Sequence, residues 1–239
     1  MHLLLEQVCN TRKFTNSKGD IVEVHSETPL GQCAFLQSII KDNHFKTSVE
    51  VGLAYGTSTL AIVDAIAANN GHAVAIDPAE NSYWGGNGLE LVKQAGYEGR
   101  LDFYEEQSHT ALSRFLAEGK KFDFAYVDST KLTDWLMVDY FLIDKLLEAG
   151  GVLVFDDVNY PSIRKLVRYI AQLPHYKVYG NWPANKQSSA IRKIIKNWLT
   201  LGANDGITVK DYKLGIYTRC VALQKIKEDE RPYDWHVKF

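Results

Sequence analysis

One stretch decides the fold of this chain: SVEVGLAYGTSTLAI, from Ser48 to Ile62. Its apolar residues are interrupted by Gly52 and Gly56, as expected where a buried strand turns sharply into a helix. The spacing is Gly-x-x-x-Gly, and not the Gly-x-Gly-x-x-Gly that brings backbone amides close to a pyrophosphate. No lysine follows Gly56, so the pattern of a P-loop is absent as well. The turn therefore favours a ligand that is recognised without phosphate groups.

Short apolar segments alternate with helical patterns along the chain, which is typical of a parallel sheet with helices on both faces. The predicted strands are Ser48–Gly52, His72–Asp77, Leu101–Glu105, Phe122–Asp128, Gly151–Asp157, Tyr176–Trp182 and Cys220–Ile226. The predicted helices are Pro29–Phe45, Ser58–Ala68, Leu89–Ala95, Thr110–Ala117, Leu132–Ala149 and Ser162–Gln172. We predict an α/β fold, a Rossmann-like, doubly wound and mostly parallel seven-stranded sheet that binds its ligands at the carboxyl ends of the strands.

The composition excludes several classes of function. The 239 residues carry 27 Lys and Arg against 29 Asp and Glu, a formal net charge of −2, which predicts no nucleic-acid partner. No apolar stretch approaches the ~20 residues that span a bilayer. The three cysteines show no metal-ligand spacing, and the first residues are too soon polar for a signal peptide. We expect a cytoplasmic protein with reduced thiols.

Polar residues around the turn suit S-adenosylmethionine. Gly56 and Ser58 offer donors for a carboxylate at a helix start, and Glu50, just inside the strand, can hold a cationic or hydroxyl-bearing group. Asp77 ends the next strand, where an acid can accept hydrogen bonds from both ribose hydroxyls. Asp77 would serve NAD equally well, so it is the glycine spacing that favours S-adenosylmethionine. The alternative is a turn glycine followed by a helix cap, with no ligand.

The same residues carry a family resemblance. The segments VEVHSETPLGQCAFL and VEVGLAYGTSTLA resemble class I S-adenosylmethionine-dependent O-methyltransferases, above all the branch of the catechol and caffeoyl-CoA O-methyltransferases and related sugar O-methyltransferases. Four residues of the turn correspond closely to the family motif, and the resemblance covers about residues 25–180. It implies the cofactor-binding residues Glu50, Gly52, Leu53, Gly56, Ser58, Asp77, Gln107, Ser108 and Asp128. It also implies that Gln107 and Ser108 meet the adenine.

Three acids follow two other strands. Asp128 ends the strand in FDFAYVDSTK, and Asp156 and Asp157 end the strand in VLVFDDVNYP. Neighbouring parallel strands lie close to 5 Å apart, so the carboxylates converge and repel each other unless a divalent cation binds them. Ligands that are all oxygen atoms favour Mg²⁺ or Ca²⁺ over zinc, and we expect Mg²⁺ or another divalent cation. The resembling family holds its metal with an Asp and an Asp-Asn pair here, so this chain has Asp157 in place of the Asn. The alternative is a generic strand end and a cap of the following helix.

Lys131 lies three residues after Asp128. In the resembling family a lysine at this spacing is the general base on the acceptor hydroxyl, so we expect Lys131 and Asp128 to be catalytic. A nearby dication would lower the lysine pKa and that of a coordinated hydroxyl. The acceptor is expected to be a small hydroxylated molecule, phenolic, catechol-like or sugar-like. The alternative is a solvated lysine at a helix start.

We expect one methyltransferase domain over residues 1–239. It would consist of an N-terminal cap segment (1–46), a cofactor-binding core (47–180) and C-terminal strands with a helical insertion (181–239), and it could form a homodimer. Two other functions stay open. One is a non-catalytic S-adenosylmethionine-binding module in which the acids are structural. The other is an NAD-type oxidoreductase, against which the glycine spacing argues.

Overall fold

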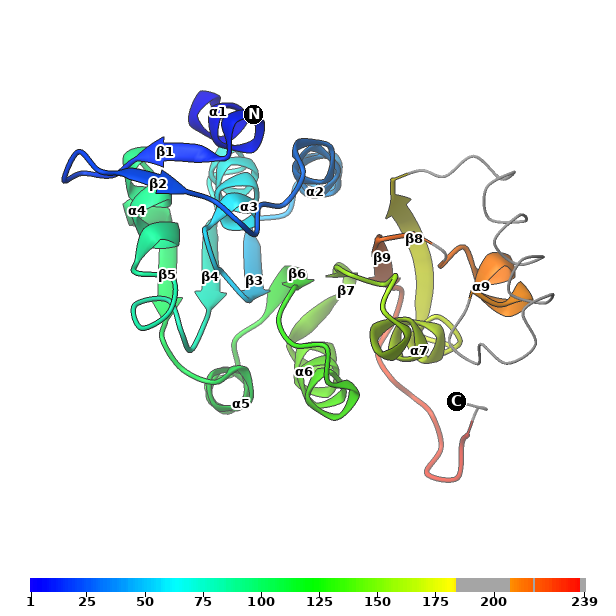
Figure 1. Cartoon of the computed structure of the whole chain (residues 1–239). Coiled ribbons are helices and arrows are strands. Elements are labelled where there is room, and N and C mark those ends of the chain that lie inside the picture. Colours follow the sequence, from blue (N-terminus) through cyan, green and yellow to red (C-terminus); the bar gives the residue numbers. More distant parts are fainter. Residues whose placement is uncertain (184–206, 217, 237–239) are drawn as a thin grey trace.

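A seven-stranded sheet runs through the centre of the molecule in the order β5-β4-β3-β6-β7-β9-β8 (Figure 1). The structure is a computed structural model that describes residues 1–183, 207–216 and 218–236. The strands of the sheet are β3 (Thr47–Val51), β4 (His72–Ile76), β5 (Leu101–Tyr104), β6 (Phe122–Val127), β7 (Leu147–Phe155), β8 (Tyr176–Trp182) and β9 (Cys220–Lys225). The first five are parallel, and β9 is antiparallel to both β7 and β8. This confirms the predicted doubly wound, mostly parallel fold.

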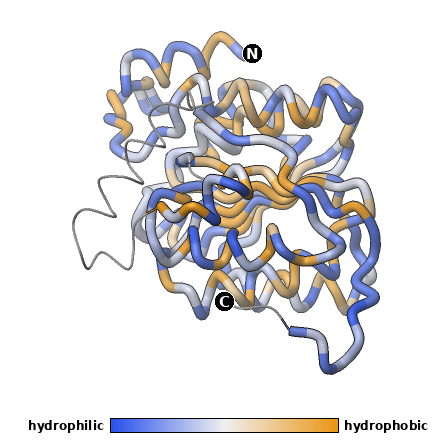
Figure 2. Tube along the Cα trace, turned by 90° about the vertical axis from the view of Figure 1, so that its right-hand side faces the viewer, coloured by the Kyte–Doolittle hydropathy of each residue, from blue (hydrophilic) through white to orange (hydrophobic). Residues whose placement is uncertain are grey.

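Helices cover both faces of the sheet. They are α1 (Leu3–Thr11), α2 (Leu30–Asp42), α3 (Thr57–Ala68), α4 (Asn87–Gln94), α5 (Ser108–Ala117), α6 (Thr133–Leu146), α7 (Pro161–Ile170) and α9 (Val209–Leu214), with a 3₁₀ turn η1 at Glu98–Arg100. Figure 1 shows α2 and α3 on one side of the sheet and α5, α6 and α7 on the other. The apolar residues gather in the central layer (Figure 2), because strands covered on both sides bury both of their faces.

Backbone hydrogen bonds align the carboxyl ends of the central strands. Gly52 donates to the carbonyl of Ile76, Asp128 to that of Val51, and Asp156 to that of Val127. Each residue that follows a strand is thereby tied to the end of the strand beside it. The turn glycine and the strand-end acids consequently meet along one edge of the sheet.

The structure differs from the sequence prediction in two places. The helix predicted to reach Ala149 ends at Leu146, because Leu147 already pairs with Phe122 as the start of β7. Helix α1 and the hairpin of β1 (Lys13–Thr15) and β2 (Ile21–Glu23) were not predicted. The predicted insertion helix lies outside the described residues. None of the described helices is long and apolar enough to cross a membrane.

Replacing Gly52 with alanine should destabilise the fold by at least about 2 kcal/mol. Gly52 has a φ of +97°, and an added Cβ would lie 2.1 Å from the carbonyl oxygen of Asp128. Gly99→Ala is the matched control, because no atom lies within 4 Å of its added Cβ. Urea unfolding measures both. Equal midpoints for the two variants would contradict the close approach of the turn to β6.

Candidate active site

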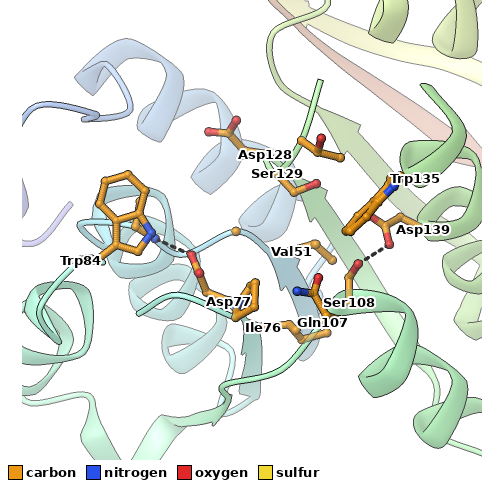
Figure 3. A pocket seen from close by; sticks show the side chains of 14 residues that line it. Val51, Ile76, Asp77, Trp84, Gln107, Ser108, Asp128, Ser129, Trp135 and Asp139 are labelled. Carbon is orange, nitrogen blue, oxygen red and sulfur yellow. Dashed lines mark hydrogen bonds between the residues drawn. The ribbon is translucent and has the colours of Figure 1, made fainter. Parts of the chain in front are cut away.

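A cavity of about 300 Å³ opens at the carboxyl edge of the sheet (Figure 3). Of the predicted cofactor residues, Gly52, Asp77, Gln107, Ser108 and Asp128 line it. The other four are buried and do not line this cavity: Glu50 lies in β3, and Leu53, Gly56 and Ser58 lie in the turn and at the start of α3. The structure therefore brings together predicted residues from four segments of the chain.

Asp77 holds the glycine turn in place. Its Oδ2 accepts hydrogen bonds from the backbone N–H groups of Leu53, at 2.9 Å, and Ala54, at 3.1 Å. Its Oδ1 accepts one from Ala79, at 2.9 Å. Oδ2 uses both of its lone pairs in this way, whereas Oδ1 keeps one, so Asp77 can shape the turn and still accept a hydrogen bond from a ligand. Figure 3 shows it beside Trp84, on the opposite side of the cavity from Trp135.

Glu50 lies beneath the turn and is 1% exposed. Ser58 Oγ donates to its Oε1 at 2.6 Å, whereas Oε2 has no hydrogen-bond partner among the described residues. Burial raises the pKa of Glu50 to about 8, against the hydrogen bond from Ser58, which lowers it. A cationic group nearby would favour its charged form.

Glu80 is a residue that the sequence analysis did not single out. It is fully buried, and its Oε1 accepts hydrogen bonds from the N–H groups of Gly88, at 2.9 Å, and Leu89, at 3.1 Å, at the start of α4. The backbone of Gly88 lies so close to Gly56 that a Cβ added to Gly56 would lie 2.7 Å from the carbonyl oxygen of Gly88. Glu80 thus fixes the loop that packs on the second motif glycine. The sequence did offer a signal for Glu80, because it is an acid that lies shortly after Asp77 and ahead of the start of a helix.

The three strand-end acids surround two cationic side chains. Lys131 Nζ lies 2.5 Å from Asp157 Oδ2 and 3.5 Å from Asp128 Oδ1. Arg219 Nε lies 3.3 Å from Asp156 Oδ1 and 3.5 Å from Asp157 Oδ1. Arg219 precedes β9 and was not predicted, because it is far away in the sequence. The convergence of the acids attracts cations, as the sequence analysis expected, and here nitrogen atoms occupy that position.

The donor set fits a hard divalent cation, since all three side chains offer carboxylate oxygens. Their spacing is wider than a closed ligand shell: among the described residues, only Asp144, His175 and Asp229 place one ligand atom each within 4.8 Å of one another. Asp156 is buried and accepts a hydrogen bond from the Tyr126 hydroxyl at 3.0 Å. A bound ion would have to draw the strand-end acids closer together and displace Lys131 or Arg219.

The electrostatics of this edge are dominated by buried acids. Burial, and then the charge of Asp156, raise the pKa of Asp128 to about 7. Burial lowers the pKa of Lys131, but the carboxylates of Asp128 and Asp157 outweigh it and leave that pKa raised. This is opposite to the lowered lysine pKa expected from the sequence, which assumed a dication on the carboxylates.

A second cavity of about 500 Å³ adjoins the first. The two share Ala54, Trp84, Asp128 and Ser129 in their walls. Lys131, Asp157 and Arg219 line the second cavity together with the polar segment 25–28. Two ligands bound side by side would therefore meet at Asp128.

Replacing Glu50 with glutamine should reduce the loss of stability at high pH. Between its ordinary pKa of 4.5 and its folded pKa of about 8, Glu50 is charged in the unfolded chain and protonated in the folded one. Folding then takes up a proton, so the free energy of unfolding falls as the pH rises. Between pH 5.5 and 8, the free energy of unfolding should therefore fall by at least about 1 kcal/mol less in Glu50→Gln than in the unmutated protein.

Urea unfolding at several pH values measures the effect of Glu50→Gln. Glu80, with a pKa raised to about 7 by burial, contributes in the same direction, so the slope should flatten without vanishing. An unchanged slope in Glu50→Gln would contradict the burial of a protonated Glu50.

Comparisons with known proteins identify the family of this chain. Residues 49–158 match the family model of a methyltransferase domain. A probable caffeoyl-CoA O-methyltransferase of Arabidopsis thaliana is 30% identical over 171 residues, 69% of each chain. A flavonoid 3',5'-methyltransferase of Vitis vinifera is 29% identical over 64% of this chain and 68% of its own. The caffeoyl-CoA O-methyltransferase of Populus kitakamiensis is 29% identical over 64% and 63%. The chain thus spans about two thirds of the length of these relatives.

Solved structures share the fold. An O-methyltransferase from Bacillus cereus in complex with S-adenosylhomocysteine has a TM-score of 0.57 at 19% identity, over 73% of this chain and 81% of its own. An O-methyltransferase from Streptomyces achromogenes in complex with S-adenosylmethionine has a TM-score of 0.59 at 16% identity, over 74% and 82%. Together with the sequence relatives, they show that the chain belongs to the class I S-adenosylmethionine-dependent O-methyltransferases, in the branch of the caffeoyl-CoA O-methyltransferases.

Proposed function

We propose that this enzyme methylates a hydroxyl group of a small acceptor bound in the second cavity, with the help of a divalent cation. The observation that carries the proposal is the contact between the two cavities at Asp128, with Lys131 and Asp157 on the acceptor side. S-adenosylmethionine supplies an electrophilic sulfonium methyl when it is bound in the first cavity. Cavities that share a wall can hold donor and acceptor in line, and such positioning supplies much of the rate.

The cofactor would be held by residues that already shape the first cavity. Asp77 would accept a hydrogen bond from the ribose hydroxyls, and Gln107 and Ser108 would lie beside the adenine. Glu50 and Ser58 would stabilise the glycine turn from behind, since they hydrogen bond to each other beneath it. These assignments are supported by the lining of the cavity and by the motif match.

Asp128, Asp156 and Asp157 would hold Mg²⁺ or another divalent ion. The ion would polarise a coordinated acceptor hydroxyl and lower its pKa. Lys131 lies in the acceptor cavity, and a dication on the carboxylates would lower the lysine pKa that they now raise, so that Nζ could take up the hydroxyl proton. Asp128 would orient that lysine through the ion pair that the two residues make here.

The lining of the second cavity indicates the kind of acceptor. It is formed mostly by charged and hydroxyl side chains, and Trp84 and His25 supply its rings. This supports a small polyhydroxylated acceptor, catechol-like or sugar-like. We further infer a cytoplasmic enzyme without a nucleic-acid partner, from its unpaired cysteines and its net charge of −2. We also propose a single domain with the boundaries given above, and a homodimer. Limited proteolysis can check the domain, and size-exclusion chromatography with light scattering can check the dimer.

Loss of the lysine or of a metal ligand should abolish methyl transfer. Lys131→Met and Asp157→Ala should each lower kcat/KM at least about 100-fold, because the acceptor hydroxyl then keeps its proton. Radiolabelled methyl transfer to a panel of catechols and sugars with vicinal hydroxyls, with Mg²⁺ or with EDTA, measures this. The affinity for S-adenosylhomocysteine should stay within about threefold. Full turnover in EDTA would refute the metal, and full turnover of Lys131→Met would remove that residue from the mechanism.

Removing Arg219 should tighten Mg²⁺ binding. Its guanidinium lies on two of the proposed ligands and competes with the ion for Asp156 and Asp157. Calorimetric titration of Mg²⁺ into protein saturated with S-adenosylhomocysteine should show an affinity about tenfold higher in Arg219→Gln. Arg12→Gln is the matched control, because Arg12 lines the same cavity but pairs with Glu27. Weaker Mg²⁺ binding in Arg219→Gln would contradict the competition.

A further inference from the structure

The cofactor cavity contains an acid that the sequence analysis did not predict. Asp139 lies in α6, is 2% exposed and lines the cavity. The hydroxyl of Ser108 donates a hydrogen bond to its Oδ1 at 2.6 Å (Figure 3). Within the described part of the chain, no residue donates a hydrogen bond to Oδ2. Oδ2 belongs to a side chain that lines the cavity, so it can accept a hydrogen bond from a ligand bound there.

The position of Asp139 indicates which part of the cofactor supplies that donor. Figure 3 shows Asp139, Ser108 and Trp135 on one side of the cavity and Asp77 on the other. If Asp77 accepts a hydrogen bond from the ribose, the base extends toward Ser108 and Asp139. The only hydrogen-bond donors on the adenine of a nucleoside are the two N–H groups of its exocyclic amine.

The hydroxyl of Ser108 donates its one proton to Asp139 and keeps acceptor lone pairs of its own, but the carboxylate is the charged and therefore stronger acceptor of the two. This hydrogen bond orients the carboxylate, so that its other oxygen is the one available to a ligand. Burial also raises the pKa of Asp139, which is the expected cost of a carboxylate whose donor is missing.

We propose that Asp139 accepts a hydrogen bond from the exocyclic amine of adenine and makes the cavity selective for a 6-aminopurine cofactor, with Ser108 as its positioning residue. The proposal rests on the assignment of the cavity to S-adenosylmethionine. A base without the amine would leave the buried carboxylate unsatisfied, and sites built around such a hydrogen bond reject analogues that lack it.

The test compares S-adenosylhomocysteine with its 6-deamino analogue, in which purine replaces adenine. Calorimetry on the whole protein should give a dissociation constant at least about tenfold higher for the analogue than for S-adenosylhomocysteine. In Asp139→Ala the two dissociation constants should agree within a factor of about two, mainly because S-adenosylhomocysteine binds more weakly. Asp139→Asn keeps an acceptor oxygen and should recover part of the ratio.

Asp134→Ala is the matched control, because Asp134 lies in the first turn of the same helix and is exposed. It should leave the ratio unchanged. An equal loss of affinity for both ligands in Asp139→Ala would mean that the residue is only structural, and would overturn the proposal, as would an unchanged ratio. If the unmutated protein binds neither ligand, the cofactor assignment itself fails, and the proposal fails with it.

Discussion

The site depends on the close approach of the backbone at Gly52 to the backbone at Asp128. A side chain at Gly52 would collide with the carbonyl of Asp128, so β3 can turn away from the sheet here only with a glycine in a left-handed conformation. That turn brings the N–H groups of Leu53 and Ala54 to the carboxylate of Asp77. The ends of three strands are locked together in this way. The first cavity is the space that they leave.

Buried acids give this edge of the sheet its chemical character. Burial raises the pKa values of Glu50, Glu80 and Asp128, the first to about 8 and the others to about 7. Such carboxyl groups cost stability when they ionise, and a cation bound nearby recovers part of that cost. The family's cofactor carries a sulfonium and an ammonium group, and a divalent ion would add two further charges. This edge of the sheet is therefore arranged to favour cationic ligands, and Lys131 and Arg219 already pair with its acids.

The sequence sufficed for those parts of the site that come directly after a strand. The alternation of apolar strands and helices predicts the sheet, and the position of Asp77 or Asp128 at a strand end predicts the edge where each lies. Arg219 could not be predicted, because only the antiparallel pairing of β9 with β7 brings it beside Asp156. Asp139 could not be predicted either: in the sequence it is one of three aspartates in α6, and only the packing of α6 against α5 gives it a role.

The central claim is that the turn at Gly52 and the acid at Asp77 form the cofactor site, and one titration tests it most directly. S-adenosylhomocysteine is titrated calorimetrically into the protein and into Asp77→Asn, which keeps the shape of the side chain but removes its charge. The account predicts saturable 1:1 binding that weakens at least about tenfold in the variant, with no competing binding of NAD. Undiminished affinity in Asp77→Asn, or tighter binding of NAD than of S-adenosylhomocysteine, would contradict it.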